Sequence, residues 1–373
     1  MNKKRFAALF LTVPPLILIV AFYLGTFHPK TIEQAKWHCE TDTPLFNPAD
    51  SLKVLNYNVQ YFAGKDYVFF YDLPDGDGPD HRPSSQSIAA TVEGIAELID
   101  RHNPDVVLLQ EVHENHVSTD HQDQTQQLLD ALSTHYPCMA EALYWKASFV
   151  PHPAIMGSAG MKLVTLSKYR MEYATRHQLS LIPGNPISQA FNLKRAVLQV
   201  GLTSHNKAPV TLFNTHLDAF SQGTDTMTKQ VAEVKQLIDG QQNWVLGGDF
   251  NLLPPGQFET LPSKQQYYYN PNTELADLWN QYPSVPSPEQ VQKEPEAWFT
   301  HFPNDPSVGQ PDRTIDYVFY HQNWRILESE VVPAFTLSDH LPIVAELILE
   351  SSILESSILE SSILENSTLE SNE

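Results

Sequence analysis

The chain has 373 residues, of which 42% are hydrophobic and 18% are charged, so it is long enough for one large core and too apolar for a disordered protein. Its 44 acidic and 23 basic side chains give a formal net charge of −21. Because proteins that hold nucleic acid usually carry a basic face, this balance disfavours a polyanionic partner, and it leaves carboxylates free to bind a hard cation such as magnesium.

The N-terminal segment predicts a membrane anchor. Three basic residues at positions 3–5 precede an uncharged run, Phe6 to Phe27, which at about 1.5 Å per helical residue is long enough to cross a bilayer. We therefore expect residues 1–30 to be a cytoplasmic basic start plus a transmembrane helix, with the catalytic domain extracytoplasmic: periplasmic, luminal or extracellular. The competing interpretation is a cleaved signal peptide, which would make the protein secreted, but no A-x-A site of small residues follows the run.

Residues 31–51 are predicted to be a linker, because they contain Pro44 and Pro48 and show little hydrophobic periodicity. The only two cysteines of the chain are Cys39 and Cys138. An oxidising extracytoplasmic compartment would allow them to pair, and two unrelated thiols are the alternative. The sequence leaves both open.

Short apolar runs of strand length recur through residues 52–349, the predicted catalytic domain. Strands are predicted over Lys53–Val59, Asp105–Gln110, Met161–Leu166, Leu193–Leu202, Pro209–His216, Asn243–Asp249, Thr314–Tyr320 and Leu341–Leu349. Amphipathic helices are predicted between them, over Ser87–His102, Thr125–His135 and Thr226–Gly240. Strands outnumber helices and the helices are interspersed, which favours two sheets packed face to face with helices outside.

An aspartate-rich stretch, Tyr71–Pro83, superficially resembles a calcium loop. It fails the EF-hand spacing, because Pro79 stands at the third ligand position and the closing glutamate is missing. We expect an exposed turn there.

The tail, residues 350–373, repeats the sequence ESSIL and then loses the pattern. A period of five matches neither the 3.6 of a helix nor the 2 of a strand, so low-complexity sequence is expected. No protein partner can be inferred from it.

Several of the apolar runs end in polar residues of one chemical type. These are Asn58, Glu111, His216, Asp249, Asn251, Asp316, Asp339 and His340. Singly, such an Asp is usually a turn residue and such a His is usually a satisfied core residue. Together, on one edge of a sandwich, they would offer carboxylates and carboxamides to a metal ion and histidines to phosphate and protons.

The ordered set N-x-N, LQE, NTH, GDFN, IDYVF and SDH, spread over residues 53–347, resembles the endonuclease/exonuclease/phosphatase superfamily. The resemblance implies an α/β fold, a four-layer α/β/β/α sandwich of two mixed sheets like that of deoxyribonuclease I. It also implies a hydrolase of phosphoester bonds in which water attacks phosphorus in line, with Mg²⁺ as cofactor and Mn²⁺ or Ca²⁺ as alternatives.

The resemblance also implies a role for each matching residue. Asn58, Glu111 and Asp339 match metal-site residues. Asp249 and Asn251 match the pair that orients and deprotonates the attacking water. His340 matches the histidine that polarises the scissile phosphoryl group and Asp316 the carboxylate that orients it, while His216 matches a second phosphate-handling histidine.

The substrate is expected to be a phospholipid head group or a small phosphoester at the membrane. The segments 216–221 and 158–169 look more like membrane-associated, sphingomyelinase-like members than like DNA-repair enzymes, and the acidic charge and predicted anchor agree. One alternative is an anchored or secreted endonuclease, and another is a catalytically dead binding module.

Overall fold

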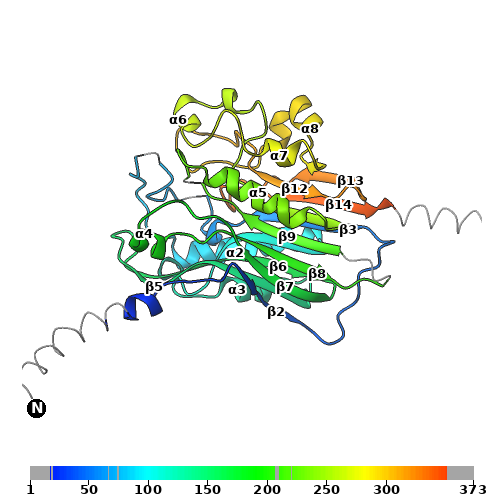
Figure 1. Cartoon of the computed structure of the whole chain (residues 1–373), viewed down its shortest axis with the longest axis horizontal. Helices are drawn as coiled ribbons and strands as arrows, with labels where there is room; N and C mark the ends of the chain where they lie inside the picture. The colour runs from blue at the N-terminus through cyan, green and yellow to red at the C-terminus, as the bar shows by residue number, and fades with distance from the viewer. Residues whose placement is uncertain are drawn as a thin grey trace, which may run out of the picture.

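The protein is a four-layer α/β/β/α sandwich, as predicted (Figure 1). The computed structural model describes residues 17, 20–65, 67–73, 75–205, 210–219 and 221–350. Two mixed seven-stranded sheets pack face to face, and helices cover both outer faces.

The sheets are built from strands that are far apart in the sequence. The first sheet has the order β1 (Ile32–Gln34), β7 (Met171–Gln178), β8 (Ala196–Leu202), β9 (Val210–His216), β10 (Trp244–Asp249), β12 (Asp316–Tyr320) and β11 (Ser284–Val285). The second has the order β13 (Trp324–Val331), β14 (Ile343–Leu349), β3 (Leu52–Asn58), β4 (Val106–His113), β6 (Gly157–Ser167), β5 (Cys138–Val150) and β2 (Lys36–Cys39).

The helices are mostly short. They are α2 (Ser85–His102), α3 (Gln124–Ala131), α4 (Pro186–Phe191), α5 (Thr226–Ile238), α6 (Ser263–Gln266), α7 (Ala276–Trp279) and α8 (Pro288–Lys293). Single 3₁₀ turns are η1 (Gln60–Phe62), η2 (Val117–Thr119), η3 (Phe258–Thr260) and η4 (Pro295–Trp298).

Helix α2 shows how local sequence sets these layers. The Ser84 side chain accepts a hydrogen bond from the Ser87 amide and caps the helix start, and Asn103 ends it in the left-handed conformation. Its apolar stripe, which includes Val92 and Ile99, packs with α3 on the outer face of the second sheet. Helix α5 covers the outer face of the first sheet in the same way. The main core lies between the sheets.

Three buried amide side chains join the two sheets just below the strand ends. The Gln110 Nε2 donates to Asn56 Oδ1 (2.9 Å) and to Asn214 Oδ1 (2.7 Å). The Asn214 Nδ2 in turn donates to the carbonyls of Leu109 and Val164. Because buried polar groups are costly unless they are paired, this network fixes how β3, β4 and β9 face one another.

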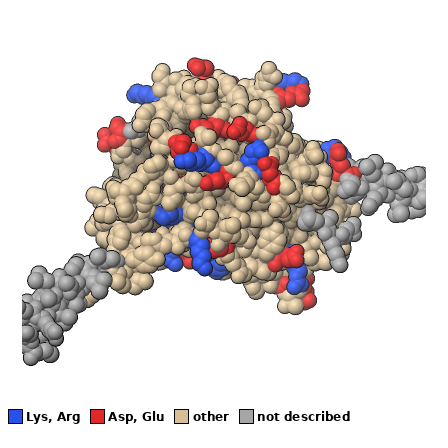
Figure 2. Space-filling model, viewed as in Figure 1, with Lys and Arg blue, Asp and Glu red and all other residues tan. Residues whose placement is uncertain are grey.

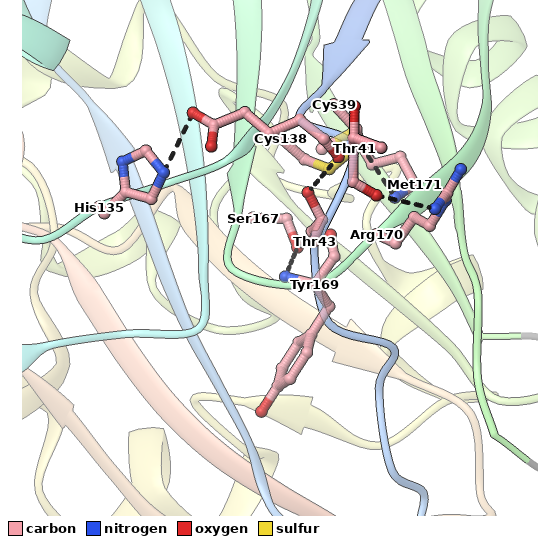
Figure 3. The surroundings of a disulfide bond; sticks show 10 residues. Cys39, Thr41, Thr43, His135, Cys138, Ser167, Tyr169, Arg170 and Met171 are labelled. Carbon is pink, nitrogen blue, oxygen red and sulfur yellow. Dashed lines mark hydrogen bonds and ion pairs between the residues drawn. A yellow bond between two sulfur atoms is a disulfide. The ribbon is translucent and has the colours of Figure 1, made fainter.

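The segment predicted to be a linker, residues 31–51, instead contains two edge strands. Strand β1 pairs with β7 in the first sheet, and β2 pairs with β5 in the second. In that pairing Cys39 lies opposite Cys138, and the two form a disulfide (Figure 3). The Met171 amide hydrogen-bonds to the Cys39 Sγ at 3.3 Å, so the disulfide also contacts the first sheet.

Two predicted segments lie largely outside the described residues. The anchor of residues 1–30 falls mainly on positions 1–16, 18 and 19, and the repeat tail on 351–373. Among the helices that the structure does describe, none combines the length and apolar character needed to span a bilayer.

Candidate active site

The residues predicted from strand ends meet at one edge of the sandwich. A cavity of about 540 Å³ is lined there by Glu111, His216, Asp249, Asn251, Asp339 and His340. The other two candidates, Asn58 and Asp316, are buried directly behind it and hydrogen-bond to lining residues. The structure therefore brings all eight together.

Asp249 lies at the centre of this cluster. Its Oδ2 accepts a hydrogen bond from Asn58 Nδ2 (3.0 Å), and its Oδ1 accepts one from the Asn251 amide (2.9 Å). The glycine before it is required, because a Cβ on Gly248 would lie 2.4 Å from the Thr215 carbonyl oxygen. Burial raises the pKa of Asp249 to about 7.

His340 is held by a buried carboxylate. Its Nδ1 hydrogen-bonds to Asp316 Oδ2 at 2.8 Å, which directs Nε2 toward Asp249 Oδ2, 3.6 Å away. Burial lowers the pKa of His340, but the negative charges of Asp316 and Asp249 outweigh it and raise the pKa well above its usual value. The imidazole is therefore cationic at neutral pH.

His216 has the opposite charge state. Its Nε2 lies 3.3 Å from Asp249 Oδ2 and 3.2 Å from Asn251 Nδ2, and its Nδ1 lies 3.4 Å from the Tyr144 hydroxyl. Burial, with the nearby positive charge of Arg195, lowers the pKa of His216 well below its usual value. The cavity thus offers one charged and one neutral imidazole on either side of Asp249.

The remaining oxygen donors suit a divalent cation. Glu111 has a positive φ of 59° at a bulge between Leu109 and Val112, which turns its side chain into the cavity lining. Burial and then the charge of Asp339 raise the pKa of Glu111, and burial raises that of Asp339. Two carboxylates in a buried site repel each other unless a cation lies near them. With Asn58, they form the all-oxygen donor set that hard cations prefer.

The structure adds a histidine that the sequence did not single out. His301 precedes β12, its Nε2 lies 3.9 Å from Asp339 Oδ2, and its ring centroid lies 4.7 Å from that of His340. Burial lowers its pKa well below the usual value. The His301, Asp339 and His340 side chains also offer ligand atoms within 4.8 Å of one another. The stretch Trp298–Phe302, in which aromatic residues surround His301, is the sequence feature that could have drawn attention to this position.

One aspartate of the predicted exposed turn belongs to the cavity. The Oδ2 of Asp72 accepts hydrogen bonds from the Phe69 amide (2.9 Å) and from Asn304 Nδ2 (3.0 Å). Burial, and then the charge of Asp339, raise its pKa to about 7. The expectation of an exposed turn holds for Asp75 and Asp77 and is wrong for Asp72.

Beyond the polar cluster, the cavity has a part with mainly aromatic and aliphatic walls, called the aromatic end below. Its walls there include Phe69, Phe70, Trp145, Ile155, Ile182, Phe191 and Leu193. Tyr61, His113 and His116 form a stack along the wall, with ring centroids 4.5 and 4.0 Å apart. Burial lowers the pKa of both histidines, so this stack is neutral.

Comparison with known proteins gives the same fold. A profile described as the Endonuclease/Exonuclease/phosphatase family matches residues 55–340. An endonuclease/exonuclease/phosphatase structure from Beutenbergia cavernae DSM 12333 is similar at 23% identity and a TM-score of 0.53, over 80% of this chain and 72% of that one. The human Nocturnin catalytic domain with a bound sulfate anion is similar at 16% identity and a TM-score of 0.50, over 85% and 97%. No curated protein sequence matches.

Proposed function

The chain belongs to the Endonuclease/Exonuclease/phosphatase family, and on this basis we propose that it is a divalent-metal-dependent hydrolase of phospholipid-type phosphoesters. The observation that carries the proposal is the shape of the cavity. Its polar end holds the acidic and histidine residues predicted from the sequence, and its aromatic end is lined mainly by aromatic and aliphatic side chains. A substrate with a phosphoryl group beside an apolar moiety matches both ends.

Each residue at the polar end of the cavity has a distinct role in the proposed hydrolysis. Asp249, with a pKa of about 7, is the general base for the attacking water, and Asn251 orients that water. Cationic His340 stabilises charge on the phosphoryl oxygens and is oriented by Asp316. Neutral His216 forms a hydrogen bond with the same phosphoryl group.

A divalent cation bound by Glu111, Asn58 and Asp339 would neutralise charge on the phosphoryl oxygens. Mg²⁺ is the ion we propose, with Mn²⁺ and Ca²⁺ as alternatives, because all three prefer oxygen ligands. Chelation with EDTA should abolish turnover, and each ion added back in excess should restore it to a different extent.

Two arginines line the cavity among the described residues. The Arg313 guanidinium is paired with Asp312 through two hydrogen bonds, whereas Arg195 has only its Nε near Asp218 Oδ1, at 3.5 Å, and its buried Nη1 has no hydrogen-bond partner. Arg195 could therefore contact one phosphate, but this small basic set disfavours nucleic acids and polyphosphorylated inositols as substrates.

We place the catalytic domain on the extracytoplasmic side of a membrane, held by the N-terminal segment, or secreted if that segment is cleaved. Two features support this location: the uncharged run from Phe6 to Phe27 and the disulfide between Cys39 and Cys138. Disulfides persist in oxidising compartments and are rare in the cytosol.

The test uses the purified full chain in detergent micelles with Mg²⁺. It is offered sphingomyelin, phosphatidylinositol lipids, bis-nitrophenyl phosphate and plasmid DNA, with the His340→Ala variant as control. We expect lipid hydrolysis that is lost in the variant. Preferential cutting of DNA would instead identify an anchored nuclease, and no turnover of any substrate with any of the three ions would favour a binding module.

A further inference from the structure

We propose that the apolar surface beside the aromatic end of the cavity is a bilayer-docking surface. This surface, called the apolar rim below, consists of Val20–Leu24, Phe149, Met156 and Ile187. The docking proposal depends on the proposed function in one respect only: the bilayer that the rim contacts is also the source of the substrate.

The rim exposes large hydrophobic side chains that normally lie in a core. The exposed fractions are 74% for Leu24, 66% for Ile187, 59% for Met156 and 49% for Phe149. Single exposed hydrophobic residues are common, whereas several on neighbouring segments mark an interaction site.

Hydrogen bonds and ring contacts show that the three segments of the rim are neighbours. The Ser148 amide donates to the Gly25 carbonyl at 2.8 Å, which joins the N-terminal segment to the end of β5. The Phe22 ring lies 5.6 Å from that of Phe191, the last residue of α4. The Trp145 Nε1 donates to the Phe191 carbonyl at 2.8 Å and closes the set.

The rim adjoins the aromatic end of the cavity. Ile155 and Phe191 line the cavity, whereas their neighbours Met156 and Ile187 are exposed. The rim therefore lies next to the apolar walls of the cavity.

The three segments are also free of charge. In a chain with 18% charged residues, none occurs in 6–27, 147–161 or 177–193. Figure 2 shows few Lys, Arg, Asp or Glu side chains on the part of this face where Figure 1 places α4 and β5. A protein interface usually carries a polar, charged rim, whereas the hydrocarbon edge of a bilayer accepts only uncharged groups.

The position of the N-terminal segment identifies the bilayer as the occupant. The apolar sequence that begins at Phe6 runs directly into the rim at Val20. If residues 1–30 are inserted in a bilayer, the rim is held against the surface of that same bilayer. The net charge of −21 gives no attraction to anionic lipids, so the contact is apolar and does not need acidic lipids.

The first experiment measures immersion of the rim directly. The full chain is reconstituted into phosphatidylcholine vesicles with and without dibrominated acyl chains, carrying a bimane label at Met156→Cys or Ile187→Cys. The native cysteines are disulfide-bonded, so each variant has one free thiol. The matched control is Leu327→Cys, a 41%-exposed hydrophobic position on β13, on the opposite side of Figure 1 from α4.

We expect a blue shift and quenching at both rim positions and neither at Leu327. Equal quenching at Met156, Ile187 and Leu327 would overturn the docking surface, whatever the enzyme cleaves. Quenching at the rim without lipid hydrolysis would leave the docking surface standing and overturn the lipid substrate.

A second experiment tests the same surface by steady-state kinetics on lipid vesicles. The double variant Met156→Gln/Ile187→Gln removes two apolar side chains that do not line the cavity. We expect KM for lipid in vesicles to rise about tenfold or more, because the favourable transfer of both apolar side chains from water into the bilayer is lost. Turnover of bis-nitrophenyl phosphate should not change. An unchanged KM for vesicle lipid would contradict the proposal.

Discussion

At the scale of single residues, the two histidines of the site differ in charge because their surroundings differ. His340 faces the buried carboxylates of Asp316 and Asp249 and is cationic. His216 is buried beside Arg195 and is neutral. Both imidazoles lie next to the Asp249 carboxylate, one protonated and one neutral. The cluster can therefore stabilise negative charge and also move a proton.

Asp316→Asn tests whether His340 depends on its carboxylate partner. An amide keeps the shape but removes the charge, so the pKa of His340 should fall and its orientation should be lost. We expect kcat to fall by about 10²- to 10⁴-fold with little change in KM. Steady-state kinetics across pH will show the difference, and circular dichroism will check the fold. An unaltered pH profile would refute this role.

His301→Gln tests the residue that the sequence did not reveal. His301 lies beside Asp339 and His340. If His301 contacts the substrate as its position in the cavity lining suggests, loss of this neutral imidazole should lower kcat by about tenfold or more, as for other single polar contacts to a transition state. The exposed His135→Gln is the matched control and should behave as wild type. Identical kcat values for the two variants would remove His301 from the site.

At the scale of elements, the central strands were predictable and the edge strands were not. The predicted runs at β3, β4, β9 and β10 are almost entirely buried, so their sequences are continuous and apolar. Strand β13 is buried only at Trp324, is otherwise exposed or partly buried, and carries Glu328 and Glu330, so its sequence has no apolar run. Site residues at strand ends were therefore predictable, whereas Asp72 and His301 lie in loops without such a signal.

A buried lysine secures the middle of β6. Lys162 has no exposed side-chain surface, and its Nζ donates to Glu114 Oε2 (2.8 Å), to Asp123 Oδ1 (2.9 Å) and to Glu141. These three carboxylates are close enough to hold a metal ion, but the ammonium group already lies among them. The cluster is therefore an ion network that links β6 to β5 and to the start of α3.

Lys162→Met should lower the free energy of unfolding by about 1–3 kcal/mol. Removing the ammonium takes one cation from the buried Glu141 carboxylate, which keeps its ion pair with the exposed Lys36, while Glu114 and Asp123 are partly exposed to water. Urea denaturation at pH 7 will measure the loss. The control is Lys146→Met at an exposed position on β5 and should change stability by less than about 0.5 kcal/mol. Equal stability of both variants would show that the network contributes nothing.

Glu141 should make the free energy of unfolding depend on pH in the acidic range. Burial would raise its pKa, but the charge and hydrogen bonds of Lys162 and Lys36 outweigh burial and hold the pKa below the usual 4.5. A lowered folded pKa means that its contribution is present above the unfolded value and is lost as the pH falls through the folded value. The stability difference between wild type and Glu141→Gln should therefore be large at pH 6 and shrink toward pH 3. A constant difference would contradict the ion pair.

At the scale of the whole molecule, the two sheets and the convergence of motifs at one edge followed from the sequence. The contribution of residues 31–51 did not, because strands of three and four residues with mixed polarity resemble a linker. Their role is set by partners at least 99 positions away, in β5 and β7. Contacts of that range leave no local pattern.

The disulfide should stabilise the whole domain without affecting chemistry. Cys39 and Cys138 are 99 positions apart, so the bridge closes a long loop in the unfolded chain. The Cys39→Ala/Cys138→Ala variant should lose about 2–4 kcal/mol of unfolding free energy. Its kcat at 25 °C should equal that of wild type, since neither residue lines the cavity. A large fall in kcat with unchanged stability would contradict this assignment.

Deleting residues 351–373 should leave turnover nearly unchanged. Every proposed site residue precedes Ile343, where β14 begins, and β14 ends at Leu349. Assays of the truncated and full chains on the same substrate will test this. A large loss of activity would show that the repeat tail belongs to the enzyme.

The course of the chain through β1 and β2 has a mechanical consequence. Residues 32–34 pair with an edge of one sheet and residues 36–39 with an edge of the other, and the chain crosses at Ala35, whose amide bonds the Ala174 carbonyl. A pull on the N-terminal end therefore loads β1 against β7 along the strand, where all three paired residues must shear together. If β1 gives way, the force reaches β2, and the covalent link at Cys39 halts further peeling. Residues 32–39 would thus resist shear and keep the domain folded when the N-terminal end of the chain is pulled.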